Sequence, residues 1–153
     1  MGLLGLIWEL GVLQPAFADG AADHQESAEL SEVVRIQVWS VHALRDGSDV
    51  DEGLRDMAQH LAGLQYGTFR LLKKDMVALP VRGAKRLELA GGLNVRVTIL
   101  ERNAQRARVR VQMYSDSGVV LDTTVAIRRD GFFIVAGPRY EGGMLVLPIF
   151  ARY

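Results

Sequence analysis

One set of four arginines has the chemistry to bind an anion. The stretch VRVTILERNAQRARVRVQM, residues 95–113, contains Arg96, Arg106, Arg108 and Arg110 at alternate positions of two segments that are otherwise rich in apolar residues. A guanidinium presents several N–H donors in a planar fork, which matches a carboxylate or a phosphate with two hydrogen bonds. We call these four residues the arginine cluster. Its chemistry predicts contact with an anionic protein, a lipid headgroup or a glycan carboxylate.

The alternation in this stretch predicts two paired strands with one apolar face and one charged face. Side chains of a strand point alternately to opposite sides, so these apolar residues can share one side: Val95, Val97, Ile99, Ala107, Val109, Val111 and Met113. A three-residue loop at residues 102–104 predicts Arg96 opposite Arg110 and Thr98 opposite Arg108. Like charges directly opposite each other destabilise a sheet, which favours a function for the cluster. The alternative is a solvated face with acidic neighbours, namely Glu101, Glu88 or Asp122.

Two histidines give an alternative function, a small hydrolase or transferase that uses His42 or His60 for proton transfer. Ser40 lies two residues before His42 and can share its strand face. The chain contains no G-x-S-x-G, S-x-x-K or H-E-x-x-H motif and no glycine-rich phosphate loop. The leading interpretation therefore has no catalytic residue and no cofactor.

The acidic residues near the histidines lack the spacing of a metal site. The segment DGSDVDEG, residues 46–53, departs from the D-x-D-x-D-G pattern of a calcium loop. Asp49 and Glu52 instead fit a capping box at a helix N-terminus, where the helix dipole favours carboxylates. We expect no bound metal.

The charge is unevenly distributed along a chain of zero net charge. Residues 1–32 contain six acidic residues and no Lys or Arg, whereas all 18 basic residues lie in residues 33–153 with the 12 other acidic residues. The first part therefore carries −6 and the second +6, which indicates a basic domain behind an acidic leader. Apolar residues make up 49% of the chain, as in a globular protein, and the absence of cysteine excludes disulfides.

The first 18 residues have the pattern of a signal peptide. An apolar run from Leu3 to Leu13 is too short to span a bilayer, and the small residues Ala16 and Ala18 fit the cleavage rule. We expect export to the periplasm or medium with cleavage after Ala18, an acidic flexible linker over residues 19–32, and no transmembrane span in the mature chain. The alternative is a cytoplasmic domain with an N-terminal helix packed on its core.

The rest of the chain predicts one mainly β domain over residues 33–153. Residues 51–67 have the apolar spacing of a helix, with one face formed by Leu54, Met57, Ala58, Leu61 and Leu64. The other segments are rich in β-branched residues or alternate with period two. About seven strands and one helix on the N-terminal side indicate an α+β fold, an antiparallel β-sandwich or open barrel. Pro148 cannot donate to a ladder, so we expect the last strand at a sheet edge or at a bulge.

The step Asp130-Gly131 predicts a hairpin. Asp-Gly between two β-segments is typical of a type I′ turn, whose two central residues both need positive φ. A two-residue loop pairs Arg129 with Phe132 and sets Ile127 opposite Ile134. The apolar residues of the two segments then share a face, so the predicted register is self-consistent.

Two resemblances to known proteins extend this interpretation. Residues 124–137 resemble the hairpin near the end of the secretin domain of outer-membrane secretion channels, through Thr124, Val125, Ile127, Asp130, Gly131, Ile134, Val135 and Gly137. This resemblance implies a hairpin but no channel function, because the chain is too short for the channel domain. From Val33 onward the chain is similar to small exported proteins of Gram-negative bacteria without an assigned function, through Tyr66, Phe69, Leu71, Leu79, Pro80, Gly143, Leu145 to Leu147 and Ile149. That similarity implies the fold and export.

Phe132 and Phe133 are adjacent in a predicted strand, so their rings point to opposite sheet faces. A ring on a solvent face is an apolar anchor of the kind found in interaction surfaces. The leading hypothesis is an exported, non-catalytic binding or envelope-assembly module that uses the arginine cluster and the exposed phenylalanine. Its expected partner is an envelope protein, an anionic lipid or a glycan. Export, and the lack of aromatic residues between the arginines, argue against nucleic acid.

Overall fold

Residues 33–153, which the computed structural model describes, contain eight β-strands and one helical segment. The strands are β1 (Val34–Leu44), β2 (Thr68–Leu79), β3 (Ala84–Glu88), β4 (Asn94–Arg102), β5 (Arg106–Ser115), β6 (Gly118–Arg128), β7 (Gly131–Tyr140) and β8 (Gly143–Arg152). The helical segment consists of α2 (Ala58–Leu61) between the 3-10 turns Glu52–Met57 and Ala62–Leu64, and a further 3-10 turn covers Ala90–Gly92. The predicted signal peptide over residues 1–18 and the predicted linker over residues 19–32 lie outside the described residues.

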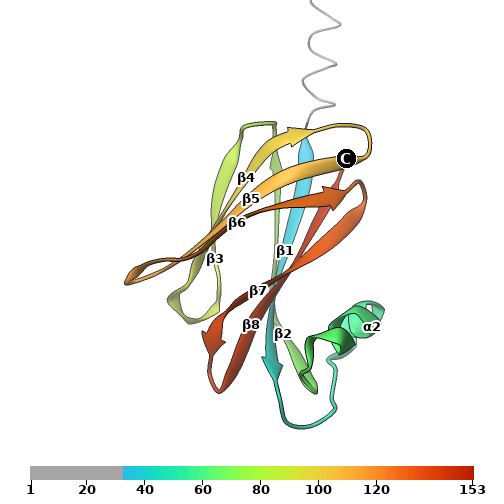
Figure 1. Ribbon diagram of the computed structural model, residues 1–153, viewed down its shortest axis with the longest axis vertical. Coiled ribbons are helices and arrows are strands. Elements are labelled where there is room, and N and C mark those ends of the chain that lie inside the picture. The colour runs from blue at the N-terminus through green and yellow to red at the C-terminus, as the bar shows by residue number, and fades with distance from the viewer. Residues whose placement is uncertain (1–32) are drawn as a thin grey trace, which may run out of the picture. The chain divides into compact units, whose positions relative to one another are not determined.

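The strands form two four-stranded antiparallel sheets (Figure 1). Sheet A has the order β2-β1-β8-β7, and sheet B has the order β3-β4-β5-β6. Each strand pairs with the strand before it except at two connections, from β2 to β3 and from β6 to β7, where the chain passes between sheets. Pairing of β8 with β1 joins the β1–β2 pair and the β7–β8 pair into sheet A. The predicted antiparallel β-sandwich is therefore confirmed, with eight strands in place of about seven.

The larger apolar core lies between the two sheets. Sheet A contributes alternate residues of its strands, such as Ile36, Val135 and Leu147. Sheet B contributes the residues predicted to share one face, all of which are fully buried: Val95, Val97, Ile99, Ala107, Val109, Val111 and Met113. The alternation in β4 and β5 is thus confirmed, and it leaves their arginines on the opposite face.

A second apolar core lies between the helical segment and the outer face of sheet A. Leu54, Met57 and Leu61 are buried against Val41 of β1 and Phe69 of β2. The predicted apolar helix face is therefore confirmed for Leu54, Met57 and Leu61. β1 has neighbours on both of its faces, because its even-numbered apolar residues join the core between the sheets and its odd-numbered ones join this second core.

The predicted capping box at the start of the helical segment is wrong. Asp51 precedes the segment, and its carboxylate makes no capping hydrogen bond there. That carboxylate instead accepts a hydrogen bond from the backbone N–H of Leu71 in β2, at 2.8 Å. The backbone carbonyl of Asp49 accepts one from the N–H of Phe69, also at 2.8 Å. Contacts with β2 therefore replace the local contacts that the sequence pattern predicts, since such side chains bond to whichever backbone group is nearest.

The predicted hairpin at Asp130-Gly131 is also wrong, as is the hairpin implied by the secretin resemblance. β6 pairs with β5 and β7 pairs with β8, so the two strands lie in different sheets. Asp130 has a φ of 58°, but Gly131 is not among the glycines with positive φ, and the type I′ turn requires both. Ile127 and Val135 both face the core between the sheets. An apolar alternation therefore fits a corner between two sheets as well as a hairpin.

β8 lies inside sheet A and keeps one register with β1 on both sides of Pro148, so neither the edge position nor the bulge predicted from this residue is found. The ladder between β1 and β8 pairs Val38 with Ile149 and Val41 with Val146, and it is interrupted between these two pairs. On its other side Pro148 pairs with Ile134 of β7. The sheet accommodates the proline by interrupting one ladder at the position where the residue has no N–H to donate.

Candidate functional site

The outer face of sheet B carries the arginine cluster. β4 and β5 bury every second residue, and their remaining side chains point to the other side of the sheet. Arg96, Arg106, Arg108 and Arg110 are all exposed. The fold therefore brings the four predicted residues onto one surface that faces solvent.

The predicted register within this cluster is wrong by two residues. Arg96 lies opposite Gln112, and Thr98 lies opposite Arg110. The turn is displaced because the side-chain oxygen of Asn103 accepts hydrogen bonds from the backbone N–H groups of Gln105 and Arg106, at 2.8 and 2.9 Å. The ladder also shifts between Ile99 and Glu101. A displacement of two preserves the inward and outward faces, which is why the burial prediction holds while the pairing fails.

Two further arginines that the sequence analysis did not select lie on this face. Arg86 of β3 is directly opposite Arg96 of β4, and Arg128 of β6 is directly opposite Arg106 of β5. Alternation in the segments KRLEL and TTVAIRR is the signal that would have identified them. We call the outer surface of sheet B the arginine face, and its arginines are Arg86, Arg96, Arg106, Arg108, Arg110 and Arg128.

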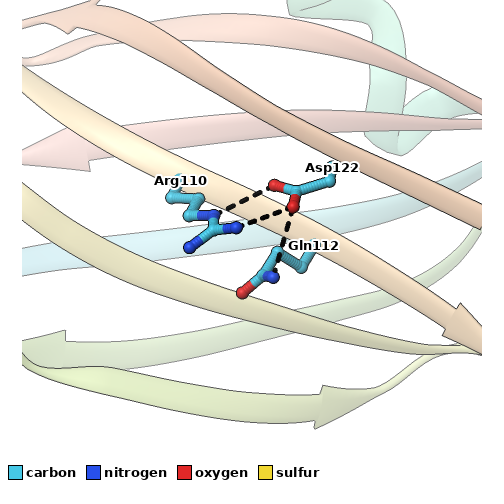
Figure 2. A network of polar contacts seen from close by, with 3 residues as sticks. All are labelled: Arg110, Gln112 and Asp122. Carbon is cyan, nitrogen blue, oxygen red and sulfur yellow. Dashed lines mark hydrogen bonds and ion pairs between the residues drawn. The ribbon is translucent and has the colours of Figure 1, made fainter. Parts of the chain in front are cut away.

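The centre of the arginine face is neutralised by two carboxylates. Arg108 forms an ion pair with Glu101 at 3.0 Å, and Arg110 makes two hydrogen bonds to Asp122 at 3.0 and 2.7 Å (Figure 2). Gln112 also donates to Asp122, at 3.4 Å. The hydrogen bonds from Arg110, followed by its charge, hold the pKa of the Asp122 carboxyl below its ordinary value. These two arginines therefore already have anionic partners within the protein.

The two ends of the arginine face are different. Within residues 33–153, Arg86, Arg96, Arg106 and Arg128 form no ion pair. The guanidinium carbon of Arg86 lies 4.8 Å from the centre of the Tyr114 ring, a cation–π contact. About six residues of β5 separate the two opposed arginine pairs, which corresponds to roughly 20 Å along a strand. The face thus presents two positively charged ends, and the row of Arg86 and Arg96 continues through Gln112 to Asp122.

The two phenylalanines lie on sheet A and not on the arginine face. The Phe132 ring contacts the rings of His60 and Phe150, with centroids 4.8 and 5.5 Å apart, on the outer side of sheet A. Phe133 pairs with Ile149, whose side chain faces the core between the sheets, and the Phe133 side chain is 42% exposed. The rings point to opposite faces as predicted, and Phe133 is the exposed one.

The two histidines lie on opposite faces of sheet A. His42 is nearly buried, and its Nε2–H donates to the carbonyl oxygen of Tyr140 at 3.0 Å. His60 is exposed on α2 and lies edge-on to Phe132. Among the described residues, no carboxylate bonds to either ring, and the buried Ser40 hydroxyl has no partner. The structure therefore does not bring together the groups that the alternative hydrolase or transferase would need.

Two adjoining grooves lie at one end of sheet A. The smaller, of about 410 Å³, is lined mainly by apolar residues such as Leu64, Met144 and Val146, with Arg45 beside them. The larger, of about 840 Å³, has two arginines and two carboxylates in its lining, namely Arg45, Arg139, Asp46 and Glu141. Neither groove is lined by a histidine. The balanced charges of the larger groove and the single charge of the smaller one indicate no particular ligand class.

Residues 33–153 contain no group of three His, Cys, Asp or Glu side chains that could hold a metal ion. They also contain no helix with the length and apolar character needed to cross a bilayer. Comparison with models of protein families, with curated proteins and with solved structures finds no match to this chain. The arrangement of the side chains therefore carries the functional argument by itself.

Proposed function

We propose that this protein is an exported, non-catalytic binding or envelope-assembly module that contacts an anionic partner through the arginine face. The presence of two opposed arginine pairs on one face carries this proposal, because the outer face of sheet A has a single such pair, Arg35 with Arg152. Arg86 faces Arg96 and Arg106 faces Arg128 at directly paired positions. Opposed like charges destabilise a sheet, so an anion that accepts hydrogen bonds from both guanidiniums of a pair relieves an existing repulsion.

The neutralised centre gives the arginine face its selectivity. Arg108 and Arg110 are held by Glu101 and Asp122, so they have little remaining capacity for an external anion. Binding should therefore depend on the two ends of the face. For this reason the informative substitutions are at Arg106 and Arg128, which form no ion pair within the described residues.

A sulfated polysaccharide resin tests this proposal. The double variant Arg106→Glu, Arg128→Glu should elute at lower salt than the unsubstituted protein. A matched control exists on the outer face of sheet A, where Arg35 and Arg152 are also directly opposite and exposed. Arg35→Glu, Arg152→Glu changes the net charge equally, and it should be retained more strongly than the first variant. Equal loss of retention would mean that binding follows net charge alone, and the proposal would then be wrong.

Export is the second part of the proposal, and it is supported by the sequence pattern around Ala16 and Ala18. The intact mass of the protein from fractionated native cells tests it. A periplasmic or extracellular chain that begins at Asp19 is the expected result. An uncleaved chain in the cytosol would contradict export and would return soluble cytosolic polyanions to the candidate partners.

A further inference from the structure

Two exposed valines lie next to the arginine face, at the hairpin between β5 and β6. The side chains of Val119 and Val120 are 58% and 43% exposed. Only three other large apolar side chains among residues 33–153 are exposed, and none of them belongs to sheet B: Leu72, Met76 and Phe133. Large exposed apolar side chains that adjoin one another are typical of contact surfaces.

The strand register places Val119 on the arginine face itself. Val119 pairs with Tyr114, which shares its side of β5 with Arg110, and the shift in the ladder leaves Val120 as the additional residue of a bulge. Leu121 then pairs with the buried Met113, so the apolar alternation resumes toward the core. The hairpin lies at the left of the view in Figure 1. Val119 and the cationic side chains therefore point in the same direction, and Val120 is exposed beside Val119.

Arg86 connects the valines to the positively charged end of the face. Its guanidinium lies over the Tyr114 ring, and Tyr114 is the residue opposite Val119. A tyrosine with an apolar ring and a polar hydroxyl is suited to the boundary between water and lipid. Val119 of β6, Tyr114 of β5 and Arg86 of β3 thus follow one another across sheet B, with β4 between the last two strands.

We propose that the arginine face docks on a bilayer rich in anionic lipids, with Val119 and Val120 at the boundary between headgroups and acyl chains. This proposal rests on the proposed function and names its partner. A soluble polyanion would satisfy the arginines and leave both valines in water. A bilayer surface supplies phosphates to two charged ends about 20 Å apart and also an apolar phase for the valines.

Co-sedimentation of the full chain with vesicles provides the test. One set of vesicles contains equal parts of phosphatidylglycerol and phosphatidylcholine, and the other contains phosphatidylcholine alone. We expect stronger partitioning to the anionic vesicles, weakened by salt, and a loss of about fivefold for each arginine removed at Arg106 and Arg128. The same residues 1–32 are present in every variant, so differences between variants report on the substituted face.

The valines allow the inference to be separated from the proposed function. The uncharged variant Val119→Ser, Val120→Ser should bind anionic vesicles about tenfold more weakly, because it removes two apolar groups from the lipid boundary. Leu72→Ser, Met76→Ser is the matched control on β2 and should bind normally. Unfolding midpoints of both variants show whether the fold is retained. Retention of both on the sulfated resin should be unchanged, since all arginines remain.

Two results would overturn the inference. Equal vesicle binding by the valine variant and its control would show that the valines do not enter the lipid. Loss of resin retention in the Arg106 and Arg128 variant, without any vesicle binding by the unsubstituted chain, would leave the proposed function intact and assign the face to a soluble polyanion or a protein. If resin retention does not depend on these arginines either, the proposed function fails as well.

Discussion

The contact between Arg110 and Asp122 couples two adjacent strands through a pair of exposed side chains. Arg110 donates two hydrogen bonds to this carboxylate, and these lower the pKa of Asp122 below the ordinary value of an exposed aspartate. A carboxyl whose pKa is lower in the folded protein than in the unfolded chain stabilises the fold at pH values above its pKa in the unfolded chain. This contribution is lost as the pH falls through its pKa in the folded protein. Asp122 should therefore stay ionised in mildly acidic solution.

An NMR titration of the Asp122 carboxyl tests this prediction. The variant Arg110→Gln should raise the pKa of Asp122 toward its ordinary value, because the hydrogen bonds are weakened and the positive charge is removed. Arg108→Gln is the control, since Arg108 pairs with Glu101 instead. The same pKa in the protein and in Arg110→Gln would show that the ion pair does not form in solution.

Glycine is required at Gly143 because the backbone of β1 lies very close to this residue. A Cβ atom there would overlap the carbonyl oxygen of Ala43 in the neighbouring strand β1. A Cβ atom added to Gly63, in the helical segment, would meet no other atom, and the φ of Gly63 is not positive. We expect Gly143→Ala to lower the free energy of unfolding by about 1–3 kcal/mol through strain, and Gly63→Ala to raise it by about 0.4–1 kcal/mol by reducing the entropy of the unfolded chain.

Urea denaturation of both variants measures these changes. The two substitutions add the same methyl group, so their opposite signs would isolate the effect of local space. A Gly143→Ala variant as stable as the unsubstituted protein would mean that β1 and β8 can move apart at little cost.

At the scale of elements, the helical segment is held by its packing more than by its local sequence. Its α-helical part is only the four residues of α2, and its first residue has no side-chain cap. A helix this short is marginal on its own. Leu61 of this segment is fully buried against sheet A, whereas the neighbouring His60 is exposed and its ring makes an edge-to-face contact with Phe132.

Leu61→Ala should therefore lower the free energy of unfolding by about 2–5 kcal/mol, because it leaves a cavity in the second core. His60→Ala should lower it by no more than about 1 kcal/mol, the order of one aromatic contact. Chemical denaturation followed by circular dichroism separates the two. A loss for Leu61→Ala as small as that for His60→Ala would indicate that the segment contributes no buried packing.

The same elements show which features were accessible from sequence. Side-chain direction in β4 and β5 was predicted because period-two alternation is a local property of each strand. The partners of β6 and β7 were not, because Asp130-Gly131 and the apolar residues on either side of it are compatible with a hairpin and with a corner. The register of β4 and β5 depends on the side chain of Asn103, which no apolar pattern reveals.

The residues of the candidate site also divide into those that local alternation predicted and those that it did not. Four of its six arginines were selected because they lie in the two most regular strands. Arg86 was not, because β3 has only five residues, and Arg128 was not, because it stands next to the Asp130-Gly131 step that indicated a hairpin. Val119 and Val120 lie at a bulge, where alternation breaks down and the sequence gives no direction for either side chain.

At the scale of the whole molecule, the two sheets depend on one shared core. β1 and β8 are interior strands of sheet A, and β5 is an interior strand of sheet B. Their buried residues meet in the core between the sheets, so neither sheet retains its apolar face when the other opens. β3 differs from these strands because it is short, lies at an edge, and pairs only with β4.

Native-state hydrogen exchange should reflect this arrangement. Paired amides of β1, β5 and β8 should exchange at the free energy of global unfolding, and all three should respond equally to low urea because they open together. Amides of Ala84–Glu88 should exchange faster, through local opening that urea hardly affects. Slower exchange in sheet A than in sheet B would contradict a single cooperative unit, and it would mean that the helical segment and the second core stabilise sheet A independently of the arginine face.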